Sequence, residues 1–113
     1  MKKKLLQELF CSKITLEINF FKKRMLKRRP EKILASAYQI NCMICIYEIL
    51  MEKSQEMGEE ALEALLMMPE ILTLFYEAWM EKGDSFQQEL ENCIHEETAE
   101  LVELSRQLEK EAA

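Results

Sequence analysis

Residues 30–53, PEKILASAYQINCMICIYEILMEK, are the most apolar stretch of the chain and constrain its fold more than any other. Apolar side chains recur there every three or four residues and fill two adjoining faces of a helix. Pro30 suits a first helical turn, where its missing N–H costs no hydrogen bond. Asn41, Glu48 and Glu52 leave only a narrow polar edge. Because so apolar a helix has to be covered, we expect 30–53 to be the central helix of a bundle.

Residues 3–28 offer a choice between helix and strand. One apolar row recurs every three or four residues, as on one face of a helix. Residues 13–20, KITLEINF, instead alternate polar and apolar side chains, like a half-buried strand. No second strand is evident to pair with it, and a lone strand would leave its backbone groups without hydrogen bonds. We therefore predict a helix over 3–28. Its apolar row is Leu6, Phe10, Ile14, Ile18, Phe21 and Met25.

Three further helices follow. Acidic residues open a short helix over 59–67, where the helix dipole favours them, and Pro69 lies just beyond its end. Large side chains fill the next helix, 70–82, and Gly83 is typical of the residue after a helix end. The third, 85–110, opens with Ser85, which resembles a capping residue. It carries an apolar seam of near-heptad spacing, interrupted at Glu97. The seam consists of Phe86, Leu90, Ile94, Leu101, Leu104 and Leu108.

The composition agrees with helices, since the 113 residues include only two Gly and two Pro. A chain of this length forms one domain and buries roughly two-thirds of the surface that it exposes when unfolded. We expect a compact all-α bundle of four to five helices, in a single domain over 1–113. The predicted helices are 3–28, 30–53, 59–67, 70–82 and 85–110.

Charge is divided along the chain. Residues 1–33 hold eleven Lys and Arg against three Glu, a net +8, and residues 34–113 hold four against eighteen acids, a net −14. The two ends either neutralise each other in the fold or face different partners. The sequence contains no window of about 18 apolar residues that could span a membrane. It contains four Cys, and its first residues do not match an export signal. We therefore expect a cytoplasmic protein with reduced thiols.

Catalytic and metal-binding patterns are weak. His95 and Glu96 begin a zinc-protease motif, but Ala99 stands where its second His belongs. Cys42 and Cys45 form a Cys-x-x-Cys pair, and Cys93 with His95 could complete four zinc ligands. Because the first two lie within an apolar helix rather than at a turn, we expect buried thiols instead. We predict no enzyme activity, no metal and no cofactor.

Two charged surfaces could bind partners. Carboxylates line the last helix at three- and four-residue spacing, about 5 to 6 Å apart, near the spacing of successive phosphates. Such a row could occupy the basic groove of a nuclease or nucleoprotein. A basic run at 22–32 could instead grip a nucleic-acid backbone. The acidic face is Glu89, Glu96, Glu97, Glu100 and Glu103; the basic run is Lys22, Lys23, Arg24, Lys27, Arg28, Arg29 and Lys32; Tyr76 and Trp79 are the expected aromatic contacts.

Short motifs resemble a family of small helical proteins of unknown function that are carried on bacterial mobile elements. The resemblance covers about residues 30–100. It rests on Pro30-Glu31-x-Ile33-Leu34-x-x-Ala37-Tyr38, on Ala64-Leu65-Leu66-x-x-Pro69-x-Ile71-Leu72, and on Trp79. It implies an intracellular bacterial or phage-like setting, in which an inhibitor of host defence of the anti-CRISPR kind is plausible.

The chain is therefore predicted to be a non-enzymatic protein-binding module, an inhibitor that docks on a nuclease or nucleoprotein through its acidic helix. One alternative is an accessory protein that binds nucleic acid through 22–32. Another is a structural homodimer formed through the seam from Leu90 to Leu108.

Overall fold

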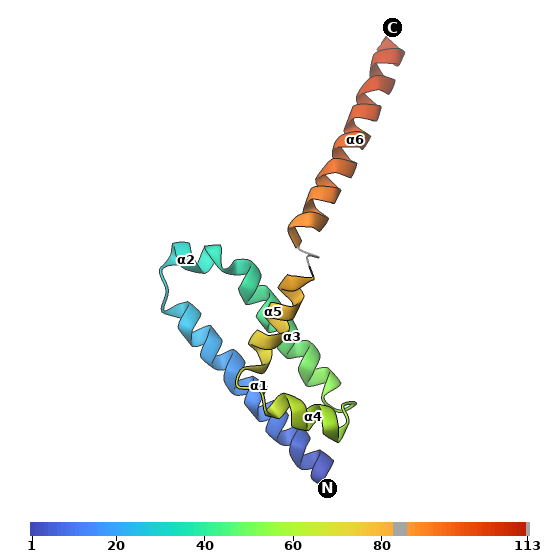
Figure 1. The fold of residues 1–113 in the computed structure, drawn as a ribbon. Coiled ribbons are helices and arrows are strands. Elements are labelled where there is room, and N and C mark those ends of the chain that lie inside the picture. The colour runs from blue at the N-terminus through green and yellow to red at the C-terminus, as the bar shows by residue number, and fades with distance from the viewer. Residues whose placement is uncertain (83–85, 113) are drawn as a thin grey trace. The chain divides into compact units, whose positions relative to one another are not determined.

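The computed structural model describes residues 1–82 and 86–112, and every regular element in them is an α-helix (Figure 1). The all-α prediction is confirmed. The predicted boundary residues Gly83 and Ser85 lie outside the described residues. The described helices are α1 (Lys2–Leu26), α2 (Pro30–Ala35), α3 (Ala37–Lys53), α4 (Glu59–Leu66), α5 (Ile71–Glu81) and α6 (Phe86–Ala112).

Helix α1 settles the choice between helix and strand at 13–20 in favour of the helix. Its strand-like alternation has a simple cause. Ile14 and Ile18 are buried, whereas Leu16 and Phe20 are exposed. In a helix, residues four apart share a face and residues two apart point to nearly opposite sides. The alternation therefore marks two apolar stripes on opposite faces of one helix.

The predicted helix 30–53 is divided at Ser36 into α2 and α3, so the described residues form six helices rather than four or five. Ser36 has φ −96° and ψ 7°, between the helical and extended regions. Its backbone N–H donates to the carbonyls of Lys32 and Ile33 at 3.0 and 3.1 Å, which tightens the end of α2. Arg28 Nη1 also donates to Ser36 Oγ at 3.5 Å.

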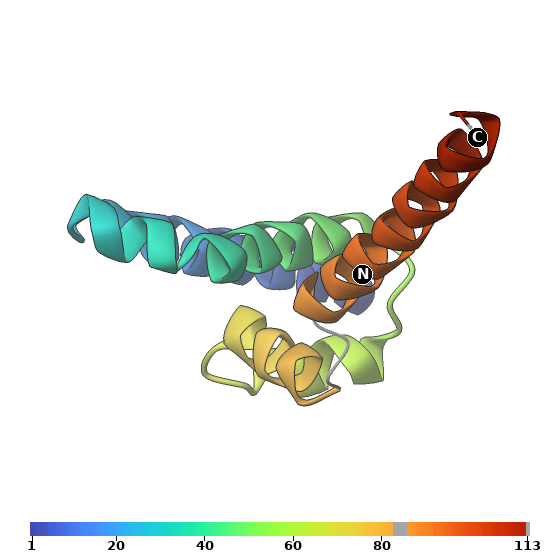
Figure 2. The same cartoon turned by 90° about the horizontal axis from the view of Figure 1, so that it is seen from above.

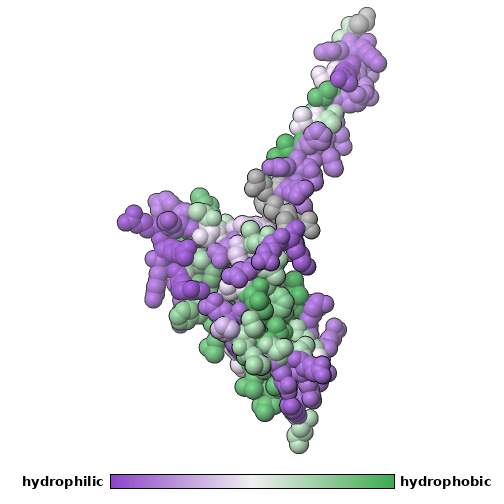
Figure 3. Space-filling model, in the orientation of Figure 1, coloured by the Kyte–Doolittle hydropathy of each residue, from purple (hydrophilic) through white to green (hydrophobic). Residues whose placement is uncertain are grey.

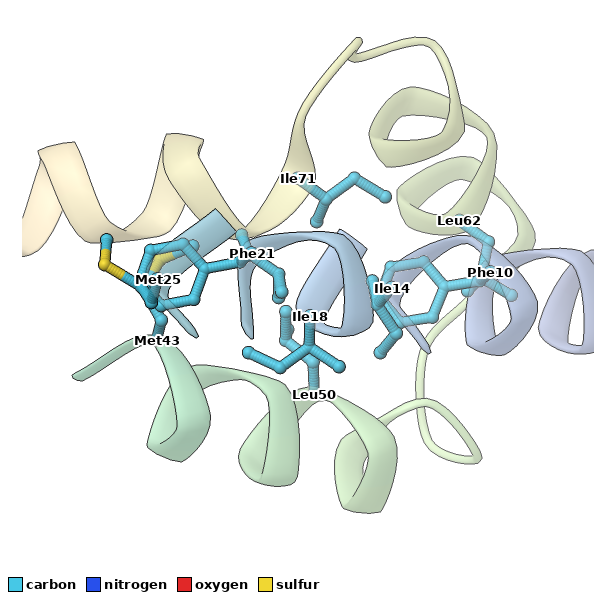
Figure 4. Packing of buried hydrophobic residues seen from close by; sticks show 10 residues of the cluster. Phe10, Ile14, Ile18, Phe21, Met25, Met43, Leu50, Leu62 and Ile71 are labelled. Carbon is cyan, nitrogen blue, oxygen red and sulfur yellow. The ribbon is translucent and has the colours of Figure 1, made fainter. Parts of the chain in front are cut away.

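Contacts between residues divide the chain into two compact units, Met1–Ala78 and Trp79–Ala113. The first contains the buried core. In it α1 packs against α3 and α4, with α4 and the following chain layered over the α1–α3 pair (Figures 1 and 2). The core residues are Phe10, Ile14, Ile18, Phe21, Met25, Met43, Leu50, Leu62, Ile71 and Leu72 (Figure 4).

The prediction that 30–53 would be the central helix is wrong, because α1 holds that place. Half of the core residues lie on α1, and α3 supplies only Met43 and Leu50. Apolar residues wrap around α3, so several stay exposed, Ile49 among them. The core row of α1 is narrower and runs almost the whole length of the helix. A continuous stripe buries more area per helix than apolar residues spread around the axis do.

Two charged residues of α1, one turn apart, hold the connection between α4 and α5. Lys13 Nζ donates to the carbonyl of Met68 and, at 3.4 Å, to that of Leu66. Glu17 accepts hydrogen bonds from the backbone N–H groups of Ile71, at 3.1 Å, and Leu72, at 2.9 Å. The cation therefore meets the carbonyl end of α4 and the carboxylate meets the N–H end of α5, as the two helix dipoles favour.

The second unit consists of the end of α5 and of α6. The described side chains of α6 from Gln88 to Ala112 are exposed. Apart from the end of α5, the described part of this unit contains no second helix. Within the unit, therefore, no other helix packs along the apolar seam of α6. The prediction of one domain over 1–113 stays a prediction.

Candidate partner-binding surfaces

The apolar seam of α6 is exposed where the structure describes it. Leu90, Ile94, Leu101 and Leu104 are between 46% and 64% exposed. They recur every three or four residues except at Glu97, which occupies the seam position between Ile94 and Leu101. The Thr98 hydroxyl bonds the carbonyl of Ile94 at 2.7 Å and so needs no outside partner. Helix α6 thus presents a continuous apolar surface with one carboxylate within it.

The predicted acidic face borders this seam. Glu96, Glu100 and Glu103 follow one another at four and three residues, and all are exposed. Arg106 Nη1 lies 3.9 Å from Glu103 Oε2, a long ion pair between exposed side chains that stabilises little. Over its 27 residues α6 has eight Glu against Arg106 and Lys110, a net charge of −6. The helix therefore combines apolar and acidic surface on adjoining sides.

The predicted basic run lies at the end of α1, in the connection that follows it and in α2, where Figure 3 shows hydrophilic surface. All seven of its cationic side chains are exposed. The Arg24 guanidinium lies over the Phe20 ring, 5.6 Å from its centroid. Lys23 and Arg24 also occupy the last turn of α1, where the helix dipole favours positive charge. The run thus has a structural role as well as a free basic surface.

The two predicted aromatic contacts differ. Tyr76 is half-buried against the core, and this burial raises the pKa of its phenol, helped by the nearby Cys42 thiol and Tyr38 phenol. Trp79 is 41% exposed. Of the pair, Trp79 offers the larger surface to a partner.

The alternative zinc ligands do not form a site in the part of the chain that the structure describes. Within residues 1–82 and 86–112 no group of three or more His, Cys, Asp or Glu side chains could hold a metal ion. The prediction of two buried thiols is wrong for Cys45, which is exposed, and Cys42 is only partly buried. Cys45 lies two positions after the buried Met43, on nearly the opposite side of a helix whose buried residues are Met43 and Leu50.

The sequence reasoning missed two features. One is the Lys13–Glu17 pair, whose spacing is that of an ordinary surface ion pair on a helix. The other is a hollow of about 300 Å³ between α1, α3 and the chain around Pro69. The alternation in KITLEINF was the available signal for it, since Leu16 and Phe20 line the hollow. The other lining residues are Glu17, Phe21, Arg24, Met43, Pro69, Glu70 and Thr73.

Comparison of the chain with protein-family models, with curated proteins and with solved structures finds no match to any of them. Among the described helices none has both the length and the apolar character needed to cross a membrane.

Proposed function

We propose that the protein is a non-enzymatic binding module of the cytoplasm that uses α6 to dock on a basic surface of another macromolecule. One observation supports this most. The described side chains of α6 are exposed, and an apolar seam runs beside a row of carboxylates. An amphipathic helix binds by laying its apolar side into a groove, and its charged border sets the partner's charge.

The partner class that fits is a nuclease or nucleoprotein. Its nucleic-acid groove is lined by Lys and Arg, and the row of Glu96, Glu100 and Glu103 would compete with phosphates for those cations. Such a protein would inhibit by occupying the groove. The resemblance to proteins of bacterial mobile elements supports the same setting, in which the inhibited enzyme belongs to host defence.

The test reverses the charge of the acidic row. The triple variant Glu96→Lys, Glu100→Lys, Glu103→Lys serves as bait in a bacterial lysate beside the wild-type chain. The control reverses Glu48, Glu52 and Glu56, which are also exposed but belong to the first unit. We expect the α6 variant to lose its captured partner, the control to keep it, and the purified wild type to inhibit that partner's nuclease activity. Equal capture by all three proteins would contradict the proposal.

A second candidate is binding of nucleic acid through the run at 22–32. It is favoured by seven exposed cations within eleven residues. Anisotropy of a labelled DNA duplex should then rise with protein and fall steeply with added salt, because binding to phosphates releases counterions. Nuclease treatment of the lysate separates the two candidates. If the protein binds nucleic acid through 22–32, the captured material should be lost after treatment; if α6 binds a protein, that protein should still be captured.

A further inference from the structure

Helix α1 carries a second apolar stripe, opposite the row that fills the core. It consists of Leu5, Leu9, Leu16 and Phe20, which are between 50% and 71% exposed. Their spacing of four, seven and four residues places them on one face of the helix. Four large apolar side chains in one exposed row on a helix that already buries its other face indicate an interaction surface.

The stripe has both a basic border and a hollow beside it. Lys23 and Arg24 lie along its edges, and the Arg24 guanidinium lies over the Phe20 ring. Leu16 and Phe20 also line the 300 Å³ hollow, together with Pro69 and two acidic residues, Glu70 and the Glu17 that caps α5. A hollow of this size accepts a large apolar side chain, which is how helices are anchored in grooves. The groove therefore fits a helix that is apolar on one side and acidic beside it.

Helix α6 has this chemistry, and its spacing matches the stripe. When the two helices are set antiparallel, Leu9 lies level with Leu101 and Leu16 with Ile94. In the same register Phe20 lies level with Leu90. Lys13 comes level with Glu97 in this register, but its ammonium already donates to the Leu66 and Met68 carbonyls. The charge match lies between the whole helices: α1 has seven Lys and Arg against two Glu, a net +5, and α6 has a net −6.

Pairing of α6 with a second α6 fits less well. Each helix has a net charge of −6, so two of them would repel. Pairing of α6 with the α1 stripe joins opposite charges instead. When each of two copies gives its α6 to the other's α1, the contact forms twice around a two-fold axis.

We infer that α6 of one copy docks in the groove on α1 of a second copy, so that the protein forms a reciprocal homodimer. This inference does not depend on the proposed outside partner. It does connect with it, because an α6 bound to a second copy is not available to a nuclease. Self-association would then set how much protein is free to inhibit.

Sedimentation of the full chain over a wide range of concentrations tests the dimer. Leu16→Glu breaks the stripe, and Leu101→Glu breaks the seam. Leu34→Glu is the control, since Leu34 is 78% exposed and belongs to neither surface. We expect each of the first two variants to weaken dimerisation about tenfold or more, and the control to leave it unchanged. Circular dichroism checks that all three remain folded.

Mixing the two defective variants gives the sharpest result. The Leu16→Glu chain keeps an intact α6, and the Leu101→Glu chain keeps an intact α1, so the mixture can form one good contact and should dimerise better than either variant alone. Added salt should weaken the wild-type dimer, because opposite charges attract across the contact. Pairing through α6 alone would leave Leu16→Glu unaffected and would grow stronger with salt, which would overturn the inference. A wild-type chain that stays monomeric at every concentration would also overturn it.

Discussion

The Glu17 carboxylate caps the helix that begins at Ile71, 54 residues later in the chain. Its two oxygens accept the N–H groups of Ile71 and Leu72, whose side chains are fully buried. These N–H groups have no partner within α5, since the first four of any helix point out of its end. Glu17 thus fixes where α5 starts and seats its first two residues in the core.

Removing this cap should destabilise the first unit. We expect Glu17→Ala to lower the free energy of unfolding by about 1–3 kcal/mol, because two part-buried N–H groups lose a charged acceptor. Glu17→Gln keeps one acceptor oxygen, so its free energy of unfolding should lie between those of Glu17→Ala and the wild type. Urea denaturation followed by circular dichroism measures both. Glu8→Ala is the control, because Glu8 is an exposed acid of the same helix, and it should change stability by no more than about 0.5 kcal/mol.

Lys13 should contribute at the other end of the same connection. Lys13→Met keeps most of the aliphatic chain and loses the donor to the Leu66 and Met68 carbonyls, so we expect a loss of about 1 kcal/mol. The exchange of the two charges, Lys13→Glu with Glu17→Lys, keeps their spacing on α1 and reverses both helix ends. If the pair acted only on each other, the exchange would be neutral; we expect it to destabilise more than either single change. The same urea titrations decide.

A chain that ends at Lys82 should keep the core of the first unit. Among the described residues, the buried core lies between Phe10 and Leu72, within Met1–Ala78. We expect cooperative unfolding with a free energy within about 1 kcal/mol of the full chain, together with a loss of helical signal equal to the 27 residues of α6. Loss of cooperative unfolding in the shortened chain would show that the core needs α6.

Stability should fall above pH 10. The pKa of Tyr76 is raised above its ordinary value of 10.0, chiefly by burial, and the pKa of Lys2 is raised above 10.5, chiefly by its hydrogen bond to Glu63. The folded protein therefore holds the protons of Tyr76 and Lys2 more tightly than the unfolded chain does. The stability that these two groups contribute is complete below pH 10 and is lost as the pH rises through their raised pKa values in the folded protein.

Thermal unfolding measured between pH 8 and about pH 11 checks this dependence. Tyr76→Phe should flatten the decline, and Lys2→Gln should flatten it less, because the ion pair of Lys2 and Glu63, 2.7 Å long, lies between exposed side chains. An equally steep decline in the double variant would mean that other groups cause it.

The sequence by itself determined the all-α class and most helix boundaries, because these depend on local properties: apolar spacing, few Gly and Pro, and proline positions. The row from Phe10 to Met25 was found from its spacing and is the row that the core buries. The seam and the carboxylates of α6 were also visible, since their faces follow from helix geometry alone.

The apolar pattern of one helix does not show which of several apolar helix faces will be buried. That depends on how the helices pack together in the folded protein. Residues 30–53 are more apolar in sequence than α1, yet α1 became central because its stripe is continuous and two helices pack against it. The contacts of Lys13 and Glu17 with helix ends more than fifty residues away, and the hollow beside Leu16 and Phe20, depend on the packing of distant segments. Such contacts form only when segments far apart in the sequence come together. The spacing of apolar and charged residues within each helix is the same with or without these contacts, so it could not predict them.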